Sequence, residues 1–146
     1  MAARFRFQLQ PLLDERERAE REKHEVFCEC GRSAGESASA IERLTRARRR
    51  CERFLAGAGR VGAVRDAHLF DAQLRSLEST LERERLRHAA LHARCERARE
   101  ELAAARRERR VIEKLKQRRR RAFDLAEARR EELDIDEANA RRGVRR

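Results

Sequence analysis

The 146-residue chain is 45% charged and only 4% aromatic, and its mean hydropathy is −0.96. So few bulky apolar side chains cannot fill a wide globular core, which argues against the enclosed sites that enzymes need. A formal net charge of +11 favours an acidic partner. No apolar run approaches the roughly 20 residues of a membrane span, and no signal-peptide core follows Met1. We therefore expect a soluble, cytoplasmic protein whose four cysteines are reduced.

The first predicted helix runs from about residue 10 to about residue 56. Pro11 fits the first turn of a helix, and Asp14 places negative charge near the positive end of the helix dipole. Gly31 and Gly35 form a soft spot that we expect the partner helix to hold in shape. Apolar residues recur with the alternating four-three spacing of a coiled coil. This seam comprises Leu9, Leu13, Phe27, Cys30, Ala34, Ile41, Leu44, Cys51 and Leu55.

Three glycines within residues 57–62 predict an elbow over residues 57–65, where a long helix can stop and reverse. A second helix is expected from Asp66, a suitable N-cap, to about residue 140. Its apolar repeat mirrors that of the first helix, so the numbers of facing residues add up to about 122. The sequence predicts one all-α domain over residues 1–146, an antiparallel coiled-coil hairpin of two long helices whose second helix is longer. The second seam comprises Ala67, Phe70, Leu74, Leu77, Leu81, Leu91, Cys95, Ala98, Leu102 and Ala105.

The second helix is expected to outrun the first. Leu9 should face Ile112 or Glu113, which leaves an overhang from about residue 113 that is about 40 Å long at 1.5 Å per residue. This overhang carries four consecutive arginines, residues 118–121. A solvated face with i, i+4 charge pairs explains most of the charge of the chain, but not this run on an unpaired helix. We interpret the run as a protein-docking surface at the same end as the basic amino terminus.

No catalytic residue, cofactor or metal is predicted. The elbow glycines are not followed by the Lys-Ser or Lys-Thr of a phosphate-binding loop. Zinc can bind between facing helices, but Cys28 and Cys30 are two residues apart and point to different faces, and His92 should point away from the seam. Seam-filling or solvated side chains explain this group more simply. The group comprises His24, Cys28, Cys30, His88, His92 and Cys95.

Three motifs occur in a characteristic order. Residues 5–13 carry the pattern Phe-x-Phe-x-Leu-x-x-Leu-Leu, a basic stretch surrounds Glu113-Lys114-Leu115, and the acidic residues 131–137 lie near the end of the chain. In this order and at this length the motifs resemble the flagellar export protein FliJ family, and the resemblance spans nearly the whole chain. The two glycines of the first helix and the four cysteines depart from the family pattern. Stalk proteins of virulence type III secretion share the expected shape but are less similar at the termini.

The resemblance implies a non-enzymatic stalk protein of the bacterial flagellar export apparatus. Such a stalk binds the hexameric export ATPase and couples it to the membrane export gate and to export chaperones, at the inner face of the cell membrane. It is monomeric when free, takes no small-molecule substrate and serves flagellum biogenesis and, through it, chemotaxis. From the arginine run and the resemblance, we expect the ATPase to contact Arg4, Arg6, Glu113, Lys114, Gln117, Arg118, Arg119, Arg120 and Arg121.

A second expected contact lies near the elbow. Phe70, Leu74, Leu77 and Leu81 form one stripe at i, i+4, i+7 and i+11, and the resemblance implies that this stripe binds the export gate. Phe70 is expected to face only Cys51, and Leu74 only Arg48, so the first helix should cover the stripe poorly. The alternative is that the stripe is simply the hairpin seam.

Two other classes of function stay open. A basic coiled coil that binds nucleic acid predicts steep salt dependence, although a basic-zipper protein needs a zipper after its basic helix, and none follows the arginine run here. A scaffold that dimerises through its seam predicts a stable oligomer in which the arginine run is dispensable. The resemblance favours a protein without nucleic-acid binding.

Overall fold

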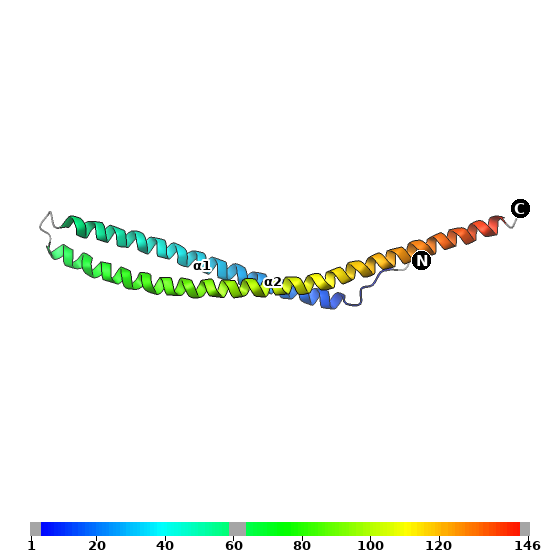
Figure 1. Cartoon of the computed structure of the whole chain (residues 1–146), viewed down its shortest axis with the longest axis horizontal. Helices are drawn as coiled ribbons and strands as arrows, with labels where there is room; N and C mark the ends of the chain where they lie inside the picture. Colours follow the sequence, from blue (N-terminus) through cyan, green and yellow to red (C-terminus); the bar gives the residue numbers. More distant parts are fainter. Residues whose placement is uncertain (1–3, 59–63, 144–146) are drawn as a thin grey trace. The chain divides into compact units, whose positions relative to one another are not determined.

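The computed structural model describes residues 4–58 and 64–143, and within these ranges it contains two α-helices and no strand. α1 spans Gln10–Ala58 and α2 spans Val64–Gly143. The two helices pack against each other and α2 is the longer, which confirms the all-α helical hairpin (Figure 1). Residues 59–63 of the expected elbow lie outside the described residues.

The start of α1 is fixed by local hydrogen bonds. The backbone N–H of Gln10 donates to the carbonyl of Phe7 at 3.0 Å, and that of Leu13 donates to the carbonyl of Leu9 at 3.0 Å. The side-chain amide of Gln10 donates to Asp14 at 2.8 Å. Pro11, which lacks an N–H, sits where the first turn leaves amide groups without a helical partner.

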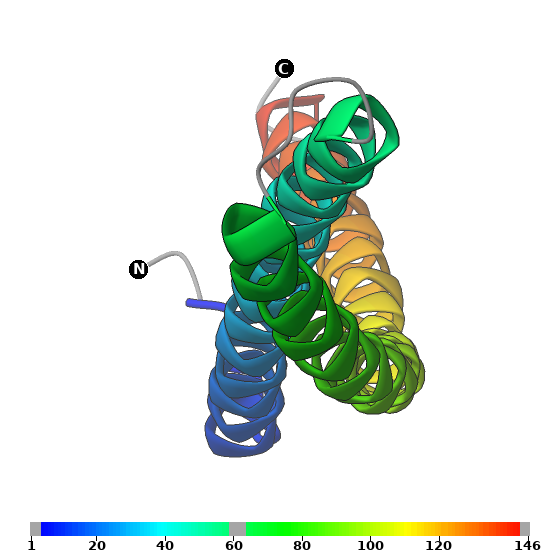
Figure 2. The same cartoon turned by 90° about the vertical axis from the view of Figure 1, so that its left-hand side faces the viewer.

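The chain divides into two compact units. The elbow unit consists of Lys23–Leu102, and the terminal unit combines Met1–Glu22 with Ala103–Arg146. Within the elbow unit, α1 and α2 run antiparallel and side by side (Figures 1 and 2). Within the terminal unit, the residues before α1 lie along α2.

The seam of the elbow unit is narrow and poor in large side chains. Leu81 is its most buried large residue at 2% exposure, whereas Leu44, Leu74 and Leu77 are only half-buried. Two helices cover a side chain from one side and leave its flanks open, so a position can belong to the seam and still reach solvent. The other buried residues of this unit are Cys30, Ser37, Cys51, Ala98 and Leu102.

Contacts across the elbow unit report its register. The hydroxyl of Ser37 donates to Glu84 at 2.7 Å, and Lys23 donates to Glu101 at 2.6 Å. Both pairs lie within two residues of the expected register. The helix continues through Gly31 and Gly35, where an added Cβ would meet nothing within 4 Å.

Candidate protein-docking site

The residues before α1 form a strap, which we define as residues 4–9; residues 4–7 have no regular secondary structure, and residues 8 and 9 form the turn that leads into α1. Side chains alternate along extended backbone, so Phe5 and Phe7 face the same side, toward α2. Phe7 is 8% exposed, and the Phe5 ring lies 5.6 Å from the Phe123 ring at an interplanar angle of 57°. The strap therefore covers a part of α2 that the sequence predicted to be bare.

The reach of the strap follows from backbone geometry. An extended residue advances about 3.3 Å and a helical residue about 1.5 Å, so two strap residues span about four residues of a helix. Phe7 lies against Arg119 and Phe5 against Phe123, which matches this ratio. The pairing sum was expected for the two helices and does not extend to Phe5 and Phe7, because the residues before Gln10 are not helical.

Two members of the arginine run are engaged by the strap. The guanidinium carbon of Arg119 lies 5.9 Å from the centre of the Phe7 ring, and that of Arg120 lies 5.4 Å from the centre of the Phe5 ring. Each such cation–π contact contributes about 0.5–1 kcal/mol at an exposed site. Arg120 also pairs with Asp124 at 2.9 Å. The strap and the arginine run thus hold each other in place.

The remaining basic residues lie on another face of α2. Lys114, Arg118 and Arg121 stand at i, i+4 and i+7, all are exposed, and helical periodicity places them opposite Phe123 and the strap. We call Lys114, Gln117, Arg118 and Arg121 the exposed basic face. Two exposed apolar side chains flank it, Val111 at 65% and Leu125 at 62%.

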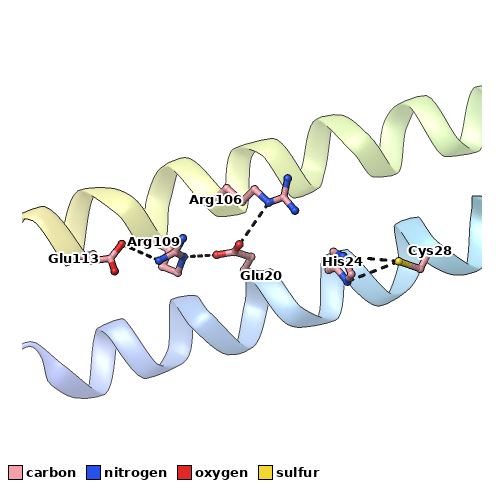
Figure 3. A network of polar contacts seen from close by, with 6 residues as sticks. All are labelled: Glu20, His24, Cys28, Arg106, Arg109 and Glu113. Atoms are coloured by element: carbon pink, nitrogen blue, oxygen red, sulfur yellow. Dashed lines mark hydrogen bonds and ion pairs between the residues drawn. The ribbon is translucent and has the colours of Figure 1, made fainter.

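A polar network connects α1 to α2 within the terminal unit (Figure 3). The carboxylate of Glu20 accepts from Arg109 and lies 3.5 Å from Nε of Arg106, and Arg109 also donates to Glu113 at 2.8 Å. The side chains of Glu20 and Arg109 are only 20% and 24% exposed. The hydrogen bond that Arg109 donates to Glu20 raises the pKa of Arg109 above its ordinary value.

All the expected ATPase-binding residues lie in the terminal unit, and those on α2 occupy more than one face of the helix. Arg4 and Arg6 are exposed on the strap, and the others lie on α2. Glu113 differs from the rest because it is tied to Arg109 inside the network. An open cleft of about 530 Å³ lies beside them, lined by Phe5, Leu13, Glu17, Glu113, Lys116, Gln117, Arg120 and Arg121.

The stripe expected to bind the export gate lies in the elbow unit. Phe70, Leu74 and Leu77 are half-buried, and Leu81 is almost fully buried. Our expectation that Phe70 faces only Cys51 is wrong, because Phe54 stacks on Phe70 with 3.8 Å between ring centres. The stripe is therefore better covered near the elbow than its sequence indicated.

The cysteines and histidines are dispersed. Cys28 is exposed, with its sulfur 3.7 Å from Nδ1 of His24 (Figure 3). Cys30 is buried on the seam. Burial, and then the neighbouring Cys30 thiol, raise the pKa of Cys95. Within residues 4–58 and 64–143, no three potential metal ligands gather at one point. No helix in this part of the chain is long and apolar enough to cross a membrane.

These features define a class: an all-α protein of two packed helices that presents charged faces and open clefts. A model of the FliJ family, described as Flagellar FliJ protein, matches residues 5–146. The chain therefore belongs to the FliJ family, which associates it with flagellar protein export. Comparisons with curated proteins and with solved structures found no significant match.

Proposed function

We propose that this protein is a non-enzymatic stalk and regulator of the flagellar type III export apparatus, and that its terminal unit binds the hexameric export ATPase. The observation that carries the proposal is the exposed basic face of α2 in the terminal unit, in a chain of the FliJ family. The chain supplies no catalytic group to the ATPase. It acts by binding the assembled or active ring more tightly than the separate subunits, which shifts that equilibrium by the difference in affinity.

The arginines of the run have different parts in this contact. Arg118 and Arg121 have no ion pair within the described part of the chain, so their charge is available to a carboxylate-rich surface. Arg119 and Arg120 are already engaged by the strap. They hold the strap, and with it Arg4 and Arg6, on α2. The flanking Val111 and Leu125 give the contact an apolar margin.

The test is stimulation of the cognate export ATPase by the purified chain. Reversing the charge of an interface arginine costs several kcal/mol, so Arg118→Glu with Arg121→Glu should weaken binding at least about 30-fold and abolish stimulation. The matched control reverses Arg85 and Arg94, two exposed arginines of the elbow unit. Circular dichroism should show unchanged helix content in both. Equal stimulation by the two double variants at moderate salt would refute the assignment.

A further comparison tests the role of the strap. Arg119→Glu with Arg120→Glu should also abolish stimulation, and it should in addition release the strap, because both cation–π contacts are lost. Hydrogen exchange of the Gln10 amide, which donates to the carbonyl of Phe7 in the strap, reports that release. The pair Arg118→Glu and Arg121→Glu should leave strap protection unchanged. If all four reversals leave stimulation intact while DNA binding falls, the nucleic-acid class is favoured instead.

We further propose that the stripe of Phe70, Leu74, Leu77 and Leu81 contributes the contact with the membrane export gate, which holds the protein at the inner face of the membrane. Its half-buried members can touch a partner at the edge of the seam, whereas Leu81 supports them from inside. Leu74→Ala should reduce binding to the cytoplasmic domain of the gate, and Leu86→Ala, a change at 64% exposure, should not. Export chaperones are the third class of partner in this proposal.

A further inference from the structure

A second basic surface lies on α1 in the elbow unit. Residues 42–53 contain six arginines and two glutamates. Leu44 and Cys51 of this segment face α2. The opposite, exposed face carries the set that we call the arginine cluster: Arg43, Arg46, Arg49, Arg50 and Arg53.

The arginine cluster is only partly neutralised within the chain. Glu42 lies 3.8 Å from Arg46, and Glu52 pairs at 3.3 Å with Arg48, which is outside the cluster. Nε of Arg53 donates to the carbonyl of Arg49 at 3.3 Å, which orders the side chain without removing its charge. These side chains form an open cleft of about 650 Å³, lined by Arg46, Arg49, Arg50, Glu52, Arg53 and Ala56.

One exposed apolar side chain borders the cluster, and a second lies on α2, next in sequence to the residue on which the first one stacks. Phe54 follows Arg50 by four residues, so the two are neighbours on the helix surface, and Phe54 is 41% exposed although it stacks on Phe70. Leu69, the residue before Phe70 on α2, is 69% exposed. Helices that lie on a membrane surface typically combine arginines with exposed aromatic and aliphatic side chains.

We propose that the arginine cluster, with Phe54 and Leu69, binds the surface of a membrane that contains anionic phospholipid. Guanidinium groups bind lipid phosphates with paired N–H donors, and the exposed apolar side chains enter the region between headgroups and acyl chains. The site is one-sided, because α2 covers the other face of α1. A planar lipid surface fits that geometry and offers the exposed Phe54 and Leu69 an apolar environment, which duplex DNA does not.

This proposal does not depend on the ATPase contact. It uses none of the residues assigned to the ATPase or to the export gate, so either proposal can fail alone. The direct probe is sedimentation of the purified full chain with phosphatidylcholine vesicles, with and without phosphatidylglycerol. The chain should bind only the vesicles that contain phosphatidylglycerol, and binding should weaken as salt is added.

Two matched pairs of variants locate the site. Each arginine near an anionic surface changes partitioning about fivefold, so Arg50→Gln with Arg53→Gln should lower it about 30-fold. Arg85→Gln with Arg94→Gln changes the net charge equally and should lower it far less. Leu69→Ser should weaken binding several-fold at high salt, where electrostatics is screened, and Leu86→Ser should not. Circular dichroism establishes that each variant is folded.

Three outcomes overturn the proposal. Equal losses in the two arginine pairs show that binding follows net charge alone. Equal binding to both vesicle types shows that the phosphate-recognising arginines are not involved. The third outcome is that the two arginine substitutions reduce the binding of duplex DNA or of polyglutamate more than they reduce vesicle binding. That result assigns the cluster to those partners instead.

Discussion

Replacing Leu81 by alanine should destabilise the elbow unit by about 2–3 kcal/mol. Leu81 is 2% exposed, so truncation removes most of the transfer free energy of a buried leucine, about 1.5–3 kcal/mol, and leaves a cavity. The open flanks of a two-helix seam let neighbouring side chains and water close that cavity in part. We therefore place the loss at the lower end of the 2–5 kcal/mol range for buried leucines. Leu77, which is half-buried, should lose less, about 1–2 kcal/mol.

The assay must report on the elbow unit alone. Cys30 and Cys51 are buried there, so the rate at which a thiol reagent labels them measures how often the unit opens. Urea unfolding followed by circular dichroism gives the global free energy for comparison. The control is Leu86→Ala at 64% exposure, which should change stability by less than about 0.5 kcal/mol. If Leu81→Ala and Leu86→Ala behave alike, the seam described above does not hold the helices together.

Two other substitutions probe stability elsewhere. Glu20→Gln should lower the free energy of opening of the terminal unit, measured by hydrogen exchange, by about 1–2 kcal/mol, because Arg106 and Arg109 lose their shared carboxylate in a half-buried setting. The control Glu108→Gln, at 56% exposure, should lower it by less than about 0.5 kcal/mol. Gly35→Ala should raise the urea midpoint by an amount equivalent to about 1 kcal/mol, since alanine favours the helix and its Cβ meets open space; a lowered midpoint would contradict this.

The helical pairing follows from local sequence signals. Apolar spacing and the glycine-rich elbow indicate two antiparallel helices, and the mirrored repeats place Ser37 within two residues of its observed partner, Glu84. Such a register is predictable because both arms have the same rise per residue, so one reference point fixes every pair. Seam membership did not predict burial, since Leu77 and Leu81 share a stripe but differ in exposure.

The strap was missed because the spacing of its apolar residues differs from the four-three repeat of the helices. Phe5 and Phe7 are two residues apart, a spacing that indicates extended backbone with both rings on one side. Phe123 was noted only as part of a thin apolar stripe, and it is the partner of Phe5. The Phe54–Phe70 stack was missed for another reason: exposed Phe54 lies beside the four-three repeat and was not counted in the seam. Aromatic side chains are long enough to contact residues that lie outside the four-three repeat.

The hydrogen bond between Ser37 and Glu84 also decides which alignments of the two helices are possible. A repeating apolar seam permits one helix to slide along the other by a whole heptad at little loss of burial. Here such a slide would set Ser37 against Leu77 or Leu91 and leave the Glu84 carboxylate, now 18% exposed, without its hydroxyl donor. A polar pair inside the seam thus specifies the register of the two helices. It favours the observed alignment over the two alignments that are shifted by seven residues in either direction.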